Sequence, residues 1–220
     1  MNHGSRTIVC GVDGSEQSVR AAKVAQALSK ALGADLVLAH VSPGGVHPLP
    51  VAHPVAAASD DELESDLSVI ADTAGRAGLT GVRTRRVAAV SPTAGLVATA
   101  RVELPYLIVI GASGHSALRE ALLGSVAGEL PHKAPCPVVV TPPGAIIPDQ
   151  MSPAAGDNSV VCGVAEAPEA QAAARTAGAL AQALERRLVL VHSRLPHPPT
   201  GSATISRRLL AIGRQGRRRA

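Results

Sequence analysis

The fold class follows from residues 6–41, which read RTIVCGVDGSEQSVRAAKVAQALSKALGADLVLAHV. An apolar, β-rich run over residues 6–12 predicts a strand, and a second such run over residues 36–41 predicts another. Between them, apolar residues recur at helical spacing over residues 17–32, and Gly33 ends the pattern as helix-terminating glycines do. Two strands joined by one short helical crossover lie parallel in a sheet, so we expect an α/β protein.

The same alternation continues along the chain. Residues 42–58 are rich in Pro and Gly without periodicity and predict a loop. Beyond it, helical spacing predicts helices over residues 60–77 and 92–103, and strand-like runs predict strands over residues 82–90 and 107–110.

Two glycine turns follow the strand that ends at residue 110. Gly111 and Gly114 predict positive φ angles and a close approach of backbone N–H groups to a ligand. Gly124 and Ser125 come just before a helical pattern over residues 126–132, where we expect Ser125 to be the N-cap. Free N–H groups at a helix start bind anions, so these residues together predict a phosphate cradle, although the same glycines could serve only as tight turns.

The full pattern resembles the nucleotide-binding signature of the universal stress protein family. It comprises the G-x-x-G-x9-G-S spacing of these residues and the run APCPVVV at residues 134–140, and the likeness extends from about Ile8 to Thr141. The resemblance implies an open, Rossmann-like parallel sheet of five strands in the order 3-2-1-4-5, with helices on both faces. It also implies that ATP is bound at its phosphates by Gly111, Gly114, Gly124 and Ser125.

At the adenosine end, the resemblance implies roles for Asp13, which follows the first strand, and Val41, which follows the second. On local sequence alone, Asp13 and Gly14 favour an ordinary turn over a nucleotide contact; the downstream glycines reverse that preference. Val90 departs from the family pattern, which has a glycine there, so we expect extra bulk near the pocket rim. Mg²⁺ could accompany the phosphates, but no residue pattern predicts a metal site on the protein.

The resemblance implies an ATP-binding, nucleotide-responsive regulator of the stress response. No pattern suggests a positioned base or a P-loop lysine, so we expect slow ATP hydrolysis at most. Two alternatives stay open. One is an interaction module of the same fold that binds no nucleotide. The other is an enzyme of the adenine-nucleotide α-hydrolase type, whose S-G-G-x-D-S loop is faintly similar to VDGS at residues 12–15.

The chain repeats itself at an offset of 152 residues. VCGV at residues 161–164 repeats residues 9–12, and LVLVH at residues 188–192 repeats LVLAH at residues 36–40. The second copy has Ala165 where the first has an aspartate, and neither a third strand nor a G-x-x-G element is predicted after it. We therefore expect a tandem protein whose truncated second copy builds no phosphate site of its own.

The chain is thus expected to contain a complete domain over residues 1–141, a linker over 142–157, a partial second repeat over 158–193 and a basic, disordered tail over 194–220. Residues 194–220 hold seven Arg and no acid, whereas residues 1–193 carry a net charge of −3. The overall charge of +4 therefore comes from the tail. A tail of this kind is typically solvated.

Composition restricts the partners. With 46% hydrophobic and 17% charged residues the chain is globular, and without Phe or Trp it offers no aromatic platform for stacking bases, so no specific nucleic-acid partner is expected.

No apolar stretch is long enough to cross a membrane and no signal peptide is evident, which favours a cytoplasmic protein. The short apolar strand over residues 138–141 is expected at the sheet edge, where it would pair in a homodimer or within the chain.

Overall fold

The computed structural model describes residues 6–44, 60–114, 123–145, 159–192 and 209–212. The chain divides into two compact units, residues 1–150 and residues 151–220, and each is described by itself.

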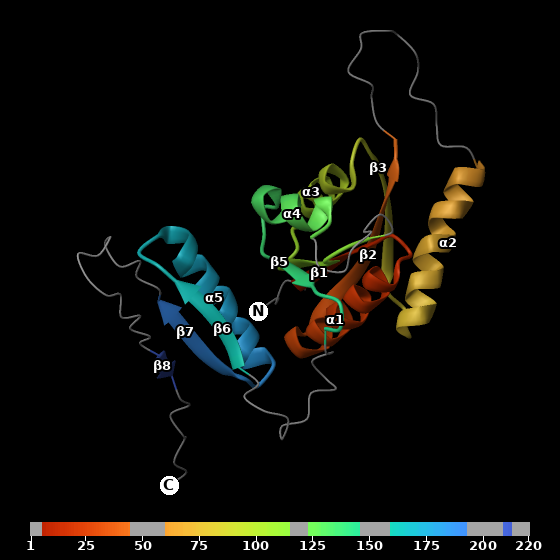
Figure 1. Cartoon of the computed structure of the whole chain (residues 1–220). Coiled ribbons are helices and arrows are strands. Elements are labelled where there is room, and N and C mark those ends of the chain that lie inside the picture. Colours follow the sequence, from red (N-terminus) through yellow and green to blue (C-terminus); the bar gives the residue numbers. More distant parts are fainter. Residues whose placement is uncertain (1–5, 45–59, 115–122, 146–158, 193–208, 213–220) are drawn as a thin grey trace, which may run out of the picture. The chain divides into compact units, whose positions relative to one another are not determined.

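The first unit alternates strands and helices in this order: β1 (Arg6–Val12), α1 (Glu16–Leu32), β2 (Ala34–Pro43), α2 (Asp60–Ala77), β3 (Arg83–Ala89), α3 (Pro92–Glu103), β4 (Leu107–Gly111), α4 (Ser125–Lys133) and β5 (Val138–Thr141) (Figure 1). Every strand pairing is parallel, and the strand order is β3-β2-β1-β4-β5. The predicted α/β class and the strand order implied by the family resemblance are confirmed.

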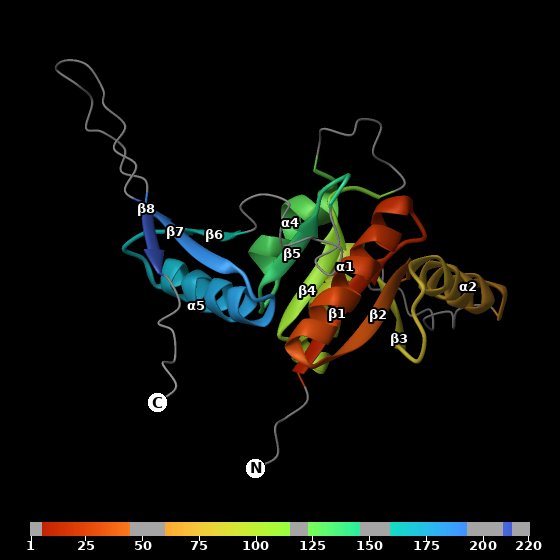
Figure 2. The same cartoon turned by 90° about the horizontal axis from the view of Figure 1, so that it is seen from below.

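Helices cover both faces of this sheet. α1 and α2 pack against each other on one face, and α3 and α4 pack against each other on the opposite face (Figures 1 and 2). The core beneath α3 and α4 is entirely aliphatic and consists of Val9, Val37, Ala39, Leu96, Ala100, Ile108, Ile110, Ala127 and Leu130. None of the helices that the structure describes is long and apolar enough to cross a membrane.

Local capping explains why the helices start and stop where they do. The Ser15 hydroxyl accepts a hydrogen bond of 3.2 Å from the amide of Ser18 at the start of α1, and Gly33 ends that helix with a left-handed φ of 60°. At α3, Ser91 is the N-cap and Pro92 follows in the first turn, where its missing N–H costs nothing. These signals are local, which is why the sequence predicted both helices closely.

β2 is longer than predicted because tertiary pairing extends it. It begins at Ala34, which pairs with Arg6 of β1, and ends at Pro43, which pairs with Ala89 of β3. The first two residues of the loop predicted over residues 42–58 therefore belong to the strand. Residues 45–59 lie outside the described part of the chain.

The two edges of the sheet differ in chemistry. At the β3 edge, Glu103 accepts hydrogen bonds from Arg83 and Arg85, with distances of 3.1 and 2.8 Å. At the β5 edge, Val138 to Val140 are half-buried valines. Charged side chains discourage unwanted strand pairing, so β5 is the edge that is chemically suited to pairing.

The second unit is a smaller β-α-β arrangement. It contains β6 (Ser159–Val164), α5 (Pro168–Ala183) and β7 (Arg187–His192), with β6 and β7 parallel, as the internal repeat predicted. A further strand, β8 (Leu209–Ile212), pairs antiparallel with β7. The sequence did not predict this strand, because four apolar residues between arginines carry little local signal; the rest of the predicted tail lies outside the described residues.

One face of the second sheet is only partly covered by the residues that the structure describes. Val161 is 65% exposed, whereas Val9, its counterpart in the first unit, is fully buried. Val9 lies beneath α3 and α4, and the described part of the second unit contains no counterpart of either helix. Among the described residues, the second unit packs α5 against one face of its sheet and has no helix on the face of Val161, although Val189, the partner of Val161 on β7, is buried.

Candidate functional site

A cavity of about 280 Å³ lies where β1 and β4 end and α4 begins. Ligands of open α/β sheets bind at this end of the strands. Its wall brings together every residue that the sequence singled out, namely Asp13, Val41, Gly111, Gly114, Gly124 and Ser125. The volume is close to the lower end of small-molecule sites, which begins at about 300 Å³.

The cavity wall combines an apolar part with a backbone-rich part. Ala39, Val41 and Leu96 form the apolar part together with Pro92. Glycines and the start of α4 form the other part, and Asp13 is the single ionisable side chain among the described wall residues. Such a wall suits a ligand that has a flat apolar portion and an anionic portion bound by N–H groups.

The two glycines at and just beyond the end of β4 are required for close approach and not for backbone conformation. The prediction of positive φ at both is wrong, since neither Gly111 nor Gly114 has a left-handed φ. A Cβ atom on Gly111 would lie 3.0 Å from Cβ and 3.1 Å from the carbonyl carbon of Gln17, in the first turn of α1. A Cβ atom on Gly114 would collide with Oδ2 of Asp13. Each glycine therefore lets the β4 loop touch the region that follows β1.

The prediction that Ser125 caps α4 is also wrong. Gly124 is the N-cap, with extended φ and ψ of −64° and 163°, and no side chain caps this helix. The Gly124 amide donates a 2.8 Å hydrogen bond to the carbonyl of Ala112, which folds the chain back onto the end of β4. Ser125 is the first helical residue, so its hydroxyl is not used for capping, and the residue lies in the cavity wall. The first amides of a helix lack intrahelical partners, which leaves donors at this wall.

Asp13 is held in a turn at the start of α1. Its Oδ1 atom accepts hydrogen bonds from the Ser15 amide at 3.0 Å and from the Ser15 hydroxyl at 2.6 Å. Its Oδ2 atom lies beside Gly114 in the cavity wall. One carboxylate oxygen therefore maintains the turn, while the other is directed at the glycine loop.

Val41 lies beyond the last residue pair of β1 and β2, which is Val12 with His40. Its position depends on Gly95 of α3, a residue that sequence reasoning missed. A Cβ atom on Gly95 would lie 2.5 and 2.7 Å from the two methyl groups of Val41. Gly95 thus lets α3 approach β2 closely enough to close the apolar part of the wall. The sequence signal that could have indicated this contact is a glycine inside a predicted helix.

Val90 does not narrow the cavity as expected. Its side chain is 74% exposed and is not among the residues of the wall. The strand β3 ends one residue earlier, and Ser91 begins the cap of α3, so Val90 points to solvent. The departure from the family pattern at this position adds no bulk to the described wall.

A charged network lies next to the cavity. His40 donates from Nδ1 to the carbonyl of Val12 over 2.8 Å, and its Nε2 lies 3.3 Å from Oδ1 of Asp66. Arg86 of β3 donates from Nε to Oδ2 of the same carboxylate. Burial by itself would raise the pKa of Asp66, but the hydrogen bond from Arg86 and the charges of His40 and Arg86 outweigh it and lower that pKa.

We expect Asp66→Asn to cost roughly 1–3 kcal/mol of unfolding free energy at pH 7, because it removes the charged partner of two nearly buried groups. The folded-state pKa of Asp66 is lowered, so its contribution is present above the unfolded-state pKa of about 3.9 and is lost as pH falls through the folded-state value. Urea unfolding of both proteins at several pH values measures this difference. A wild-type advantage that stays constant down to the acid limit would contradict the network.

Glu129→Gln is the matched control for that prediction. Glu129 also has a lowered pKa, caused by its hydrogen bond with Lys133, but both side chains are more than half exposed. Solvent screens such a pair, so the control should change the unfolding free energy little at any pH.

Among the described residues, no group of three or more His, Cys, Asp or Glu side chains is placed to hold a metal ion. The described wall therefore contains no protein cage for Mg²⁺. Cys10, which lies near the cavity in β1, is fully buried, and burial raises the pKa of its thiol to about 12, so it acts as a small apolar core residue.

The fold and the cavity define an open parallel α/β protein with a cavity at the strand ends. A model of the universal stress protein family matches residues 4–142, and the chain belongs to this family. No curated protein matches the chain.

Several solved structures are similar. A universal stress protein in complex with cAMP is 28% identical, with 62% of this chain and 96% of that chain covered and a TM-score of 0.46. The universal stress protein UspA from Lactobacillus plantarum is 22% identical, with coverages of 63% and 99% and a TM-score of 0.46. A universal stress protein from Archaeoglobus fulgidus in complex with dAMP is 24% identical, with coverages of 61% and 96% and a TM-score of 0.42.

Proposed function

We propose that this protein binds ATP in the cavity and acts as a nucleotide-responsive regulator of the stress response. The observation that carries the proposal is the meeting of Gly114, Asp13 and the start of α4 around one cavity. Side-chain bulk at Gly114 would fill this space, and the adjoining helix start offers N–H donors. Family membership supports the same proposal.

In this proposal, each part of the wall meets one part of the nucleotide. Gly111, Gly114, Gly124 and Ser125 hold the phosphates through backbone N–H groups and one hydroxyl. Asp13 and Val41 contact the adenosine end, where the apolar wall excludes water from one face of the base. Any Mg²⁺ would be held mainly by the phosphate oxygens.

The wall is better suited to holding ATP than to cleaving it. Asp13 is the single carboxylate among the described wall residues, and its Oδ1 already accepts two hydrogen bonds from Ser15. A water molecule that attacks a phosphate needs a group that orients it and accepts its proton. We therefore propose that ATP hydrolysis is slow and that the bound nucleotide is the signal.

A second candidate function is interaction through β5. This strand lies at the sheet edge, and its valines are half-buried, whereas the opposite edge carries the Arg83 and Arg85 pairs with Glu103. Pairing of β5 with a second copy or within the chain would cover an apolar edge. This activity would require no nucleotide, so the test of ATP binding separates the two candidates.

The test is to purify the full chain, denature it, and identify any released nucleotide by chromatography, with calorimetric titration of ATP and GTP into the emptied protein. We expect ATP to be released in near-stoichiometric amount and to bind more tightly than GTP. An emptied protein that binds neither nucleotide would overturn the proposal and favour the β5 interaction module. Rapid release of AMP and pyrophosphate during incubation would instead indicate an enzyme of the α-hydrolase type.

A further inference from the structure

The two peptide carbonyls on either side of Asp13 are both held from outside the cavity. The Val12 carbonyl accepts a hydrogen bond of 2.8 Å from Nδ1 of His40. The Gly14 carbonyl accepts one of 3.0 Å from Nη1 of Arg76. Asp13, between them, is the one ionisable residue of the described cavity wall. The main chain that carries this carboxylate is therefore restrained on both sides.

Both restraints lead to α2. Arg76 lies in the last turn of that helix. His40 belongs to β2, but its Nε2 lies 3.3 Å from Asp66, which also lies on α2 and is held in turn by Arg86. Asp66 lines up with the buried residues Ile70 and Thr73 on the inner side of the helix. The helix that covers this face of the sheet is thus linked to the residues flanking Asp13.

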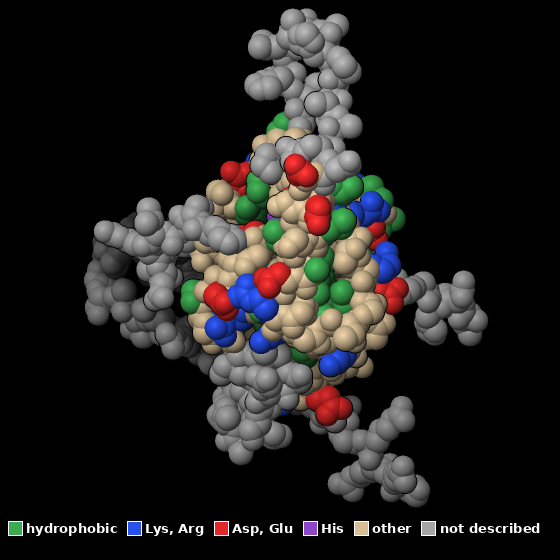
Figure 3. Space-filling model, turned by 90° about the vertical axis from the view of Figure 1, so that its right-hand side faces the viewer, with side chains coloured by type: hydrophobic (Ala, Val, Ile, Leu, Met, Phe, Trp, Pro, Cys, Tyr) green, Lys and Arg blue, Asp and Glu red, His purple; other side chains and the backbone are tan. Residues whose placement is uncertain are grey.

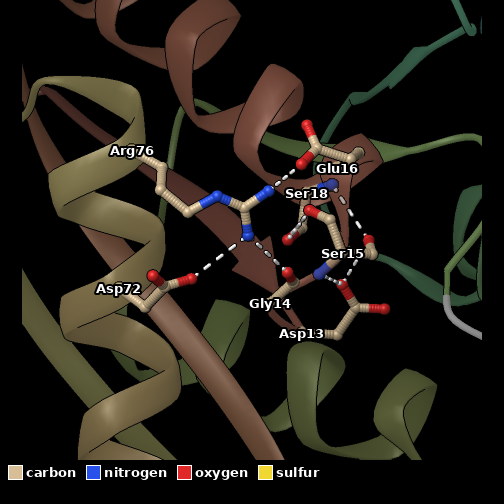
Figure 4. A network of polar contacts seen from close by, with 7 residues as sticks. All are labelled: Asp13, Gly14, Ser15, Glu16, Ser18, Asp72 and Arg76. Carbon is tan, nitrogen blue, oxygen red and sulfur yellow. Dashed lines mark hydrogen bonds and ion pairs between the residues drawn. The ribbon is translucent and has the colours of Figure 1, made fainter.

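Arg76 has a contact that ordinary surface ion pairs lack. Figure 4 shows its guanidinium between Gly14, Asp72 and Glu16, with Nη1 3.1 Å from Asp72 and Nη2 bonded to Glu16. The two acidic side chains are 55% and 83% exposed, so these ion pairs alone contribute little. Figure 3, viewed from the α2 side, shows acidic and basic side chains next to one another on this face. The bond to a main-chain carbonyl beside Asp13 is what distinguishes Arg76.

Hydrogen exchange at the Ser15 amide reports how firmly the turn between these two hydrogen bonds is held. Gly14 has a left-handed φ of 84°, and its carbonyl accepts the hydrogen bond from Arg76. The Ser15 amide donates to Oδ1 of Asp13 at 3.0 Å. A turn that moves more freely would break this bond more often, so the Ser15 amide would exchange its hydrogen faster.

We propose that Arg76 and His40 are positioning residues that hold the turn so that Oδ2 of Asp13 stays beside Gly114 in the cavity. Neither side chain lines the cavity, so both act through the main chain. The proposal rests on the proposed function in one respect, since the benefit of a fixed Asp13 is expressed as affinity for ATP. The holding of the turn can be measured without any nucleotide.

The first measurement is amide hydrogen exchange of the nucleotide-free full chain by NMR. Arg76→Met and His40→Leu should speed exchange at Ser15 by about threefold to tenfold, the effect of losing one hydrogen bond. Arg76→Lys should restore part of the protection. Arg83→Met and His192→Leu are the controls: Arg83 pairs with Glu103, and His192 is the exposed counterpart of His40 in the second repeat. Both controls should leave Ser15 unchanged.

The second measurement is ATP affinity in a double-mutant cycle with Asp13→Asn. Arg76→Met should weaken ATP binding by about threefold to tenfold in the wild-type background, and by much less once Asp13 is replaced, because the residue acts through that carboxylate. A general loss of stability would instead weaken binding equally in both backgrounds.

Unchanged Ser15 exchange in Arg76→Met would overturn the proposal whether or not ATP binds. Equal losses of affinity in the two backgrounds would overturn it as well. If wild-type protein binds no ATP, the proposed function fails, and Ser15 exchange alone then decides whether these residues hold the turn.

Discussion

Gly114→Val should abolish ATP binding and leave the fold intact. A Cβ atom at this position would collide with Oδ2 of Asp13, and the two valine methyl groups would extend further into a cavity of about 280 Å³. The collision can be relieved by displacing Asp13 or Gly114, neither of which belongs to the buried core. Both movements break the arrangement proposed to hold the nucleotide. The measurement is calorimetric titration with ATP, together with thermal unfolding.

Gly128→Ala is the matched control for this substitution. Gly128 lies on α4, only four residues beyond the N-cap, but a Cβ atom there would meet nothing within 4 Å. Alanine favours a helix over glycine by about 0.5–1 kcal/mol, so the control should bind ATP normally and be slightly more stable. Normal ATP affinity in Gly114→Val would show that the nucleotide lies elsewhere.

Leu130→Ala should cost about 2–5 kcal/mol of unfolding free energy, because it leaves a void in a core that has no aromatic side chains to refill it. Leu130 is fully buried where α4 packs on the sheet, among Val9, Ile108 and Ala127. A loss of this size is a large fraction of the stability of an ordinary domain. Chemical denaturation of the full chain, followed by circular dichroism, measures it.

Leu67→Ala is the control for the core substitution. Leu67 lies on α2 and is 48% exposed, so its truncation removes little burial and should change the unfolding free energy by less than about 0.5 kcal/mol. If the two leucine variants lost equal stability, Leu130 would not be packed as the structure shows. Since α4 also begins at the cavity, Leu130→Ala should weaken ATP binding under conditions where part of the protein is unfolded.

Much of the fold could be predicted because its signals are local. α2, α3 and β5 begin and end at the residues that the sequence indicated. Their boundaries depend on periodicity, capping serine and proline, which act within a few residues of each other. β2 was predicted too short, because its ends are decided by pairing with β1 and β3. β8 was missed for the same reason, since its pairing with β7 joins segments that are distant in sequence.

The candidate site shows the same division. Glycine spacing and the family resemblance singled out the residues that line the cavity, but the reason for each residue came from packing. A glycine is needed at position 114 because a side chain there would collide with Asp13. A glycine is needed at position 95 because a side chain there would collide with Val41. Asp66 stood in the sequence as one more acid on a helix, and only the fold places it between His40 and Arg86.

The sequence by itself determined the order of strands and helices from β1 to β7, the internal repeat and a set of residues that line one cavity. The tertiary structure alone decided that Gly124 and not Ser125 caps α4, that Val90 faces solvent, and that α2 is linked to both carbonyls beside Asp13. The physical reason is that periodicity and capping act between neighbours in the chain. Exposure, close approach and hydrogen bonds between elements depend on residues that only folding brings together.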